Sequence, residues 1–91
     1  MPKDMLEYRK EIDRIDDEII RLLNERSKSV IEIGKIKKEK DAEANLHTQG
    51  RETAIIERLT KLNPGPFPSE AIRSVYREIM SASLSLEAPQ K

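Results

Sequence analysis

Residues 4–41 read DMLEYRKEIDRIDDEIIRLLNERSKSVIEIGKIKKEKD, and this stretch decides the fold. It contains no proline, and its single glycine is Gly34. Apolar side chains recur along it with the three- and four-residue spacing that places them on one face of an α-helix. These side chains are Met5, Tyr8, Ile12, Ile15, Ile19, Leu22, Ile33 and Ile36. The stretch predicts one long helix, with Asp4 as its N-cap and lysines near its carboxyl end.

The remainder of the chain predicts two shorter helices. Residues 42–50 lose the helical period and predict a loop that ends in glycine. A second helix is expected from about Arg51 to Leu62, because residues 63–68 read NPGPFP and prolines cannot continue a helix. Ser69 is expected to cap a third helix. The expected inward-facing side chains are Ala54, Ile55, Leu59 and Leu62 in the second helix, and Ile72, Val75, Tyr76, Ile79, Met80, Ser83 and Leu86 in the third.

The fold class follows from these helices. No stretch shows the alternation of a β-strand, and 91 residues are enough for one small domain but not for two. We therefore expect an all-α fold of one long, one short and one medium helix in a single domain, residues 1–91. The first residues lack the apolar segment of a signal peptide, and no run approaches 18 apolar residues. A cytoplasmic protein that does not bind a membrane is expected.

The composition excludes several kinds of chemistry. Lys plus Arg and Asp plus Glu both number 17, so the chain lacks the positive field that nucleic-acid binding requires. Cysteine is absent and there is one histidine. Thiol nucleophiles, histidine-based triads and the usual zinc sites are therefore not expected. Any catalysis must use lysine, arginine, carboxylates and serine.

The length of the first helix argues for a homodimer. A helix over these residues spans about 55 Å, whereas a compact globule of 91 residues is about 30 Å across. The two shorter helices could not cover its apolar face, but a second long helix alongside could. The alternative is a monomeric bundle in which the long helix breaks near Ser27 to Ser29. That alternative is disfavoured because no glycine or proline lies there to make the turn.

Cations stand where this helix should be apolar. The heptad positions of Ile12, Ile19 and Ile33 include Arg26, and a guanidinium on such a seam is unfavourable without an anion. Lys37 lies about 20° from Arg26 around the helix and about 16 Å along it. Both cations could hold one anion, or they could pair with carboxylates across the dimer or reach solvent.

Further polar residues are candidates for the same site. Arg9 lies about 25 Å along the helix from Arg26, so only an antiparallel partner could bring it there. Arg51 opens the second helix, where a cation meets the positive end of the helix dipole and Glu52 is better placed. The third helix carries Ser83 and Glu87 four residues apart on its inward face. The alternative for Glu87 is a frayed, exposed helix end.

These residues, in this order and spacing, resemble the all-helical (AroQ-type) class of chorismate mutases over nearly the whole chain. The segments that carry the resemblance are Tyr8-Arg9, Ile12-Asp13-x-Ile15-Asp16, Leu22-Leu23-Asn24-Glu25-Arg26, Ile33-Gly34-Lys35-Ile36-Lys37, Arg51-Glu52, Asn63-Pro64-Gly65-Pro66-Phe67 and Ser83-Leu84-Ser85-Leu86-Glu87. The resemblance implies an intertwined homodimer of three-helix chains. It also implies an isomerase that converts chorismate to prephenate, toward phenylalanine and tyrosine, without a metal or cofactor.

The resemblance also implies roles for the site residues. Arg26 and the partner's Arg9 would hold the two carboxylates of the substrate, and Lys37 would contact a carboxylate and the ether oxygen. Arg51 would support this cluster and Glu52 would take the ring hydroxyl. In the third helix, Ser83 would assist a carboxylate and Glu87 would reach the ether oxygen. Catalysis would rest on Arg26, Lys37 and Glu87.

Two features differ from other members of this class. An acidic residue often stands three positions before the Arg-Glu pair, where this chain has Thr48, and glutamine often stands where it has Glu87. The alternative function is a non-catalytic or regulatory helical dimerisation module, because such domains also occur fused to other enzymes of the aromatic pathway. A helix-turn-helix DNA-binding protein is disfavoured by the balanced charge and the long proline-rich turn.

Overall fold

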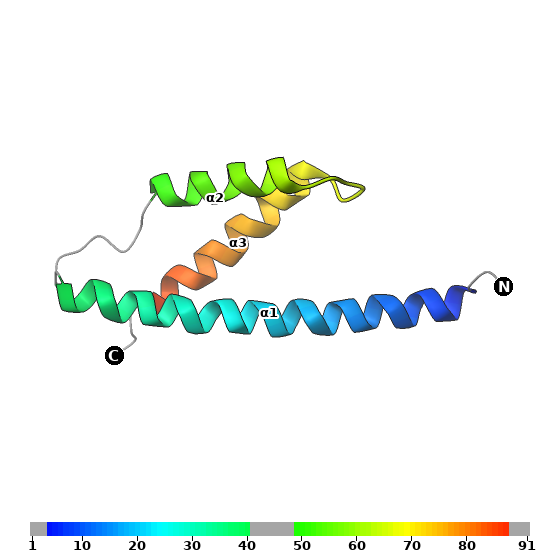
Figure 1. Ribbon diagram of the computed structural model, residues 1–91, viewed down its shortest axis with the longest axis horizontal. Helices are drawn as coiled ribbons and strands as arrows, with labels where there is room; N and C mark the ends of the chain where they lie inside the picture. The colour runs from blue at the N-terminus through cyan, green and yellow to red at the C-terminus, as the bar shows by residue number, and fades with distance from the viewer. Residues whose placement is uncertain (1–3, 41–48, 88–91) are drawn as a thin grey trace.

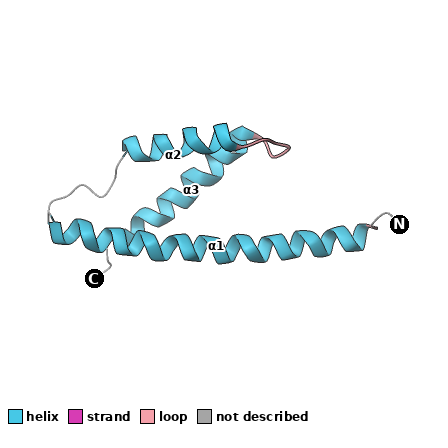
Figure 2. Ribbon diagram, viewed as in Figure 1, coloured by secondary structure: helices cyan, strands magenta, loops and turns pink. Residues whose placement is uncertain are grey.

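The computed structural model describes residues 4–40 and 49–87, and these residues form three helices and no strand (Figures 1 and 2). Helix α1 spans Met5–Lys40, α2 spans Gln49–Leu62 and α3 spans Ser69–Glu87. The expected all-α class, with one long, one short and one medium helix, is confirmed.

Helix α1 is continuous for 36 residues. At its start the Glu7 amide donates to Asp4 Oδ1 at 3.0 Å and the Asp4 amide donates to Glu7 Oε1 at 3.3 Å, so Asp4 is the expected N-cap. Near its middle, Ser27 Oγ donates to the Leu23 carbonyl at 2.9 Å. The hydroxyl thus bonds within the helix instead of interrupting it. The alternative of a helix broken near Ser27 is wrong.

Helix α2 begins two residues earlier than expected, and Gly50 lies in its first turn instead of in the loop. The first amides of a helix need no partner inside it, so a glycine there weakens no helical hydrogen bond. At the other end, Asn63 organises the turn as its Nδ2 donates to the Phe67 carbonyl at 2.7 Å. Gly65 takes a positive φ of 76° in this turn, which favours glycine.

Helix α3 begins one residue earlier than expected. Ser69 belongs to the helix, and the Pro68 carbonyl accepts the Ile72 amide at 3.2 Å. The N-cap position is therefore Pro68 and not Ser69, which was expected to cap the helix.

Helix α3 runs obliquely between the other two helices and is the element that holds them together (Figure 1). Its first turns pack along α2, and its last turns reach the carboxyl half of α1, whereas the described parts of α1 and α2 do not approach each other. The core lies between α2 and α3. It consists of Ile55, Ile56 and Met80, with Leu59 and Tyr76 packed against them.

The predicted inward faces are only partly covered. Val75, Leu86 and Leu62 are exposed, whereas Ile56 is buried although it was not expected to be. The reason is that three helices in one thin layer give each helix few neighbours. Ile56 is buried because α3 packs on a different side of α2 from the one that faces α1.

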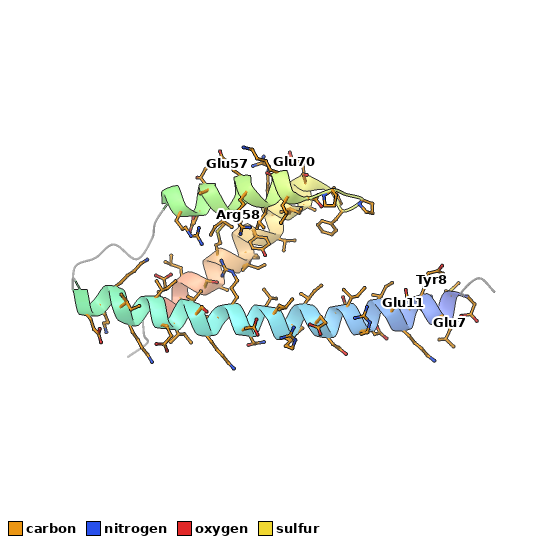
Figure 3. The ribbon with its side chains drawn as sticks, viewed as in Figure 1. Glu7, Tyr8, Glu11, Glu57, Arg58 and Glu70 are labelled. Carbon is orange, nitrogen blue, oxygen red and sulfur yellow. The ribbon has the colours of Figure 1, made fainter. Side chains whose placement is uncertain are left out.

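The molecule is elongated, with extents of 60 × 27 × 16 Å and a radius of gyration of 17.0 Å. A compact domain of this length has a radius of gyration of about 12 Å. Figure 3 shows that no other helix lies over Glu7, Tyr8 and Glu11 in the amino-terminal part of α1. The apolar stripe there is exposed, including Tyr8, Ile12 and Ile15. None of the described helices is long and apolar enough to cross a membrane.

Candidate active site

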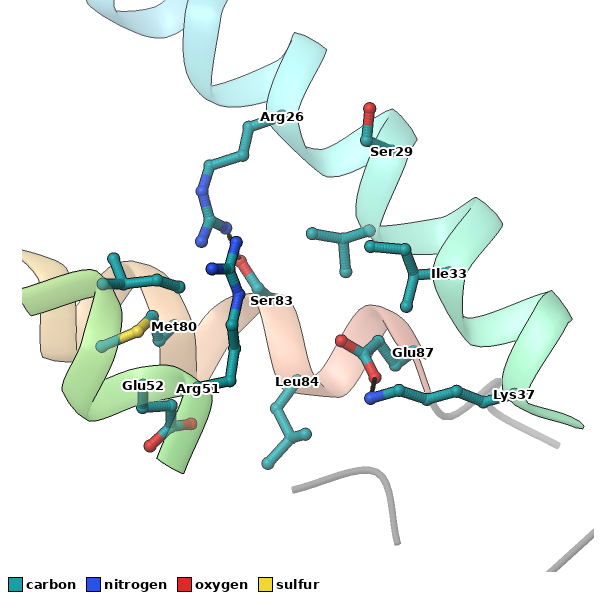
Figure 4. Close-up of a pocket in the computed structure, with 12 residues that line it drawn as sticks. Arg26, Ser29, Ile33, Lys37, Arg51, Glu52, Met80, Ser83, Leu84 and Glu87 are labelled. Atoms are coloured by element: carbon teal, nitrogen blue, oxygen red, sulfur yellow. Dashed lines mark hydrogen bonds and ion pairs between the residues drawn. The ribbon is translucent and has the colours of Figure 1, made fainter. Parts of the chain in front are cut away.

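A cavity of about 420 Å³ lies between the carboxyl half of α1, the first turns of α2 and the last turns of α3 (Figure 4). Its lining residues are Arg26, Ser29, Val30, Ile33, Lys37, Arg51, Glu52, Ile55, Met80, Ser83, Leu84 and Glu87. The structure thus brings together every candidate site residue from the sequence except Arg9.

One end of the cavity is formed by Arg26 of α1 and Ser83 of α3. Arg26 Nη1 donates to Ser83 Oγ at 2.7 Å, and Ser83 Oγ donates to the Ile79 carbonyl at 2.7 Å. The hydroxyl proton is therefore used within α3, and the oxygen faces the guanidinium. Helix α3 orients Arg26 through this contact, since the two residues are 57 positions apart in sequence.

Arg26 is half-buried, and among the described residues no carboxylate pairs with it. The two glutamates that were considered as its partners are engaged on the surface of α1. Glu25 pairs with Arg21 at 3.4 Å and Glu32 pairs with Lys35 at 3.3 Å. A half-buried cation without a nearby carboxylate favours an anion from outside the chain.

Arg51 adds a second guanidinium at the same end. It projects from the first turns of α2, and Figure 4 shows it reaching toward Arg26 and Ser83. Within the described residues it too has no carboxylate partner. The next residue, Glu52, is half-buried and lines the cavity below it. Two guanidinium groups directed at one place repel each other unless an anion lies between them.

The opposite end holds an ion pair between Lys37 of α1 and Glu87 of α3. Lys37 Nζ donates to Glu87 Oε1 at 3.0 Å, and the two side chains are 27% and 15% exposed. Glu87 is the last residue of α3, so the helix continues to the site. The alternative of a frayed, exposed Glu87 is wrong.

Apolar side chains form the wall between the two charged ends. Val30 and Ile33 come from α1, Ile55 from α2, and Met80 and Leu84 from α3. Sequence reasoning did not assign these residues to the site. A signal was present, because Val30 follows Arg26 by four residues and such neighbours share a helix face.

Two residues singled out in the sequence lie elsewhere. Arg9 is exposed on the amino-terminal part of α1, about 25 Å along the helix from Arg26, and it does not line the cavity. Thr48 lies outside the described residues. No group of three or more histidine, cysteine or acidic side chains in the described ranges is arranged to hold a metal ion.

The charges of the cavity define what it can bind. Three cations, Arg26, Lys37 and Arg51, face two carboxylates, Glu52 and Glu87. A guanidinium forms two parallel hydrogen bonds with a carboxylate, which fixes the orientation as well as the position of an anion. The apolar wall would enclose a carbon skeleton between the charged ends. The site therefore suits a small organic acid held in a single conformation.

Comparison with known proteins agrees with this geometry. A family model described as chorismate mutase type II matches residues 8–88. The chain belongs to this family. Chorismate mutases of Thermus thermophilus have the same fold: form II has a TM-score of 0.88 and 43% sequence identity and covers 98% of this chain and 99% of its own. Form I has a TM-score of 0.81 and 42% identity and covers 89% and 99%.

Longer relatives of this chorismate mutase family member carry a second activity in their names. The bifunctional chorismate mutase/prephenate dehydratase of Aquifex aeolicus is 51% identical over 89 residues, which cover 93% of this chain and 24% of that protein. The protein of the same name from Neisseria gonorrhoeae is 39% identical over 85 residues, which cover 93% and 22%. The chain spans about a quarter of the length of these relatives.

Proposed function

We propose that the chain is a chorismate mutase, an isomerase that rearranges chorismate to prephenate in the biosynthesis of phenylalanine and tyrosine. One observation carries the proposal: the cavity directs two guanidinium groups without carboxylate partners to one end and a lysine–glutamate pair to the other. Chorismate is a dicarboxylate with an ether bond, so it matches this arrangement of charges. Family membership over residues 8–88 supports the same reaction.

The residues of the cavity suit a reaction that needs no nucleophile. The rearrangement is pericyclic and unimolecular, with one carbon–carbon bond forming as the carbon–oxygen bond of the ether breaks. A site accelerates such a step by holding the reactive conformation and by stabilising charge on the breaking ether. Arg26 with Ser83 would hold a carboxylate, and Arg51 would support them. Lys37 would stabilise the negative charge that grows on the ether oxygen.

The carboxylates have separate roles in this proposal. Glu52, half-buried beside Arg51, would accept the hydrogen bond of the ring hydroxyl. Glu87 would contact the ether oxygen, next to Lys37. The ammonium group of Lys37 is already oriented by Glu87 before substrate binds, at 3.0 Å. Such preorganisation reduces the rearrangement of polar groups that the reaction would otherwise require.

We propose further that the active form is an intertwined homodimer in which the partner's Arg9 completes each site. The chain exposes 7726 Å², whereas a compact monomer of 10.5 kDa exposes about 5,400 Å². The excess of two chains together is of the size that obligate homodimers bury. An antiparallel α1 from a second copy would cover the apolar stripe and carry its Arg9 toward Arg26.

A turnover assay tests the proposed reaction. The chain is mixed with chorismate, and the disappearance of chorismate and the appearance of prephenate are followed for the wild type and for Lys37→Ala. We expect turnover by the wild type and a kcat lower by roughly 10²–10³-fold in the variant, because the charge on the ether oxygen loses its main stabilising group. Absence of turnover by the wild type would contradict the proposal.

Glu87 should give the reaction a characteristic pH dependence. An ionised carboxylate cannot donate a hydrogen bond to the ether oxygen, whereas a protonated carboxyl or an amide can. We therefore expect kcat to rise as the pH falls from mildly alkaline to mildly acidic values. Glu87→Gln should remain active with a nearly flat profile over the same range. A wild-type profile that is flat and unchanged by this substitution would rule out the donor role.

A second candidate function is a regulatory dimerisation domain within a fused enzyme of the aromatic pathway. It is favoured by the bifunctional relatives, of which the chain spans about a quarter. Saturable binding of chorismate or of a pathway product without turnover would support this alternative. The cytoplasmic location expected from the sequence remains a prediction.

A further inference from the structure

The last turn of α3 lies directly on α1 at Gly34. Gly34 is buried, and a Cβ atom at this position would lie 2.7 Å from the Glu87 carbonyl oxygen and 2.8 Å from Glu87 Cα. Favourable contacts between carbon atoms begin at about 3.5 Å. The obstructing atoms belong to the backbone of α3, so no side-chain rotation could make room. Any other residue at position 34 must move the end of α3.

Conformation does not explain this glycine. Gly34 lies inside α1, and among the described glycines only Gly65 takes a positive φ. Apart from proline, glycine is the weakest helix former. Its presence far inside a 36-residue helix is therefore explained by the space that α3 occupies and not by the backbone of α1.

The same residue of α3 makes both contacts with α1. The backbone of Glu87 rests on Gly34, and its carboxylate accepts the hydrogen bond from Lys37 Nζ at 3.0 Å. Gly34 and Lys37 are three residues apart and so are neighbours on the surface of α1. The distance between the helices at Gly34 therefore sets the distance between the carboxylate and the ammonium group.

We infer that Gly34 is a positioning residue of the active site, which lets α3 approach α1 closely enough for Glu87 to meet Lys37. The inference rests on the proposed function. A methyl group at position 34 lifts the end of α3 and separates the two charged groups. The Arg26–Ser83 contact, one helical turn earlier in α3, is displaced less. The damage falls on the end of the cavity where the ether would break.

The test compares Gly34→Ala with Gly50→Ala in the full chain. Both substitutions add one methyl group to a helical glycine, but a Cβ atom at Gly50 meets nothing within 4 Å. We expect Gly34→Ala to lower kcat for chorismate roughly 10²-fold, the effect of a displacement near 1 Å, with a smaller change in KM. We expect Gly50→Ala to keep wild-type kcat and KM.

A double-mutant cycle separates positioning from a general structural role. In the Glu87→Ala background, adding Gly34→Ala should lower kcat less than twofold, because the carboxylate that it displaces is already gone. The same loss in both backgrounds would overturn the inference. Wild-type kinetics in Gly34→Ala, or loss of the folded chain, would overturn it as well.

A second measurement distinguishes failure of this inference from failure of the proposed function. The coupling between Lys37→Ala and Glu87→Ala is measured in urea unfolding, once in the wild-type background and once with Gly34→Ala. We expect the coupling to disappear in the second background. If the wild type did not turn over chorismate but this loss were observed, the proposed function would fail and the positioning role would stand. Unchanged coupling would reject the positioning role.

Discussion

Replacing Arg26 with alanine is expected to lower kcat/KM for chorismate by roughly 10²–10³-fold, the usual effect of removing one preorganised donor from a catalytic site. Arg26 is half-buried, is oriented by Ser83 at 2.7 Å and has no carboxylate partner among the described residues. The substitution removes the group best placed to bind a substrate carboxylate. Steady-state kinetics of the purified variant measure the loss.

Two variants show whether the loss comes from the guanidinium itself. Arg26→Lys keeps the charge but cannot form two parallel hydrogen bonds, so its activity should fall between those of the wild type and Arg26→Ala. Arg21→Ala is the matched control. Arg21 lies five residues earlier on α1, about 140° around the helix, and pairs with Glu18 at 2.8 Å on the surface. A similar loss in Arg21→Ala would indicate a general effect on α1.

Mixing inactive Arg9→Ala chains with inactive Arg26→Ala chains is expected to restore about a quarter of wild-type activity. Half of the randomly formed dimers contain one chain of each kind. In such a dimer one site lacks both arginines, whereas the other has Arg26 from one chain and Arg9 from the other. The chains are unfolded together, refolded and assayed for chorismate turnover.

Each variant refolded alone is the control, because its sites all lack the same arginine and should stay inactive. Failure of the mixture to recover activity, while wild-type chains recover theirs by the same procedure, would reject the shared site. The proposed reaction could survive that result. Activity of Arg9→Ala alone near the wild-type level would likewise remove the partner's Arg9 from the site.

The sequence predicted the helices well because their signals are local. The spacing of apolar residues and the prolines of residues 63–68 depend on neighbouring positions in the chain, and the ends of α1, α2 and α3 fall within two residues of expectation. The small errors have local causes too. A glycine is tolerated in the first turn of α2, and a proline can occupy the N-cap position of α3.

The site was predictable where it depends on charge. Arg26 could be singled out because a cation on an apolar seam requires an explanation, and the structure gives it a partner, Ser83, that sequence alone could not identify. Gly34 could not be recognised in the same way. A glycine in a helix carries no sign of what lies over it, and only the packing of Glu87 reveals its purpose.

The uncovered half of α1 has a consequence for how the protein behaves on dilution. A helix half that meets no other part of its own chain gains little from folding until a second copy arrives. If a second copy provides that cover, folding and association are one reaction governed by mass action, and the melting temperature depends on concentration. Specific activity would then fall as the protein is diluted, although each chain remains chemically intact.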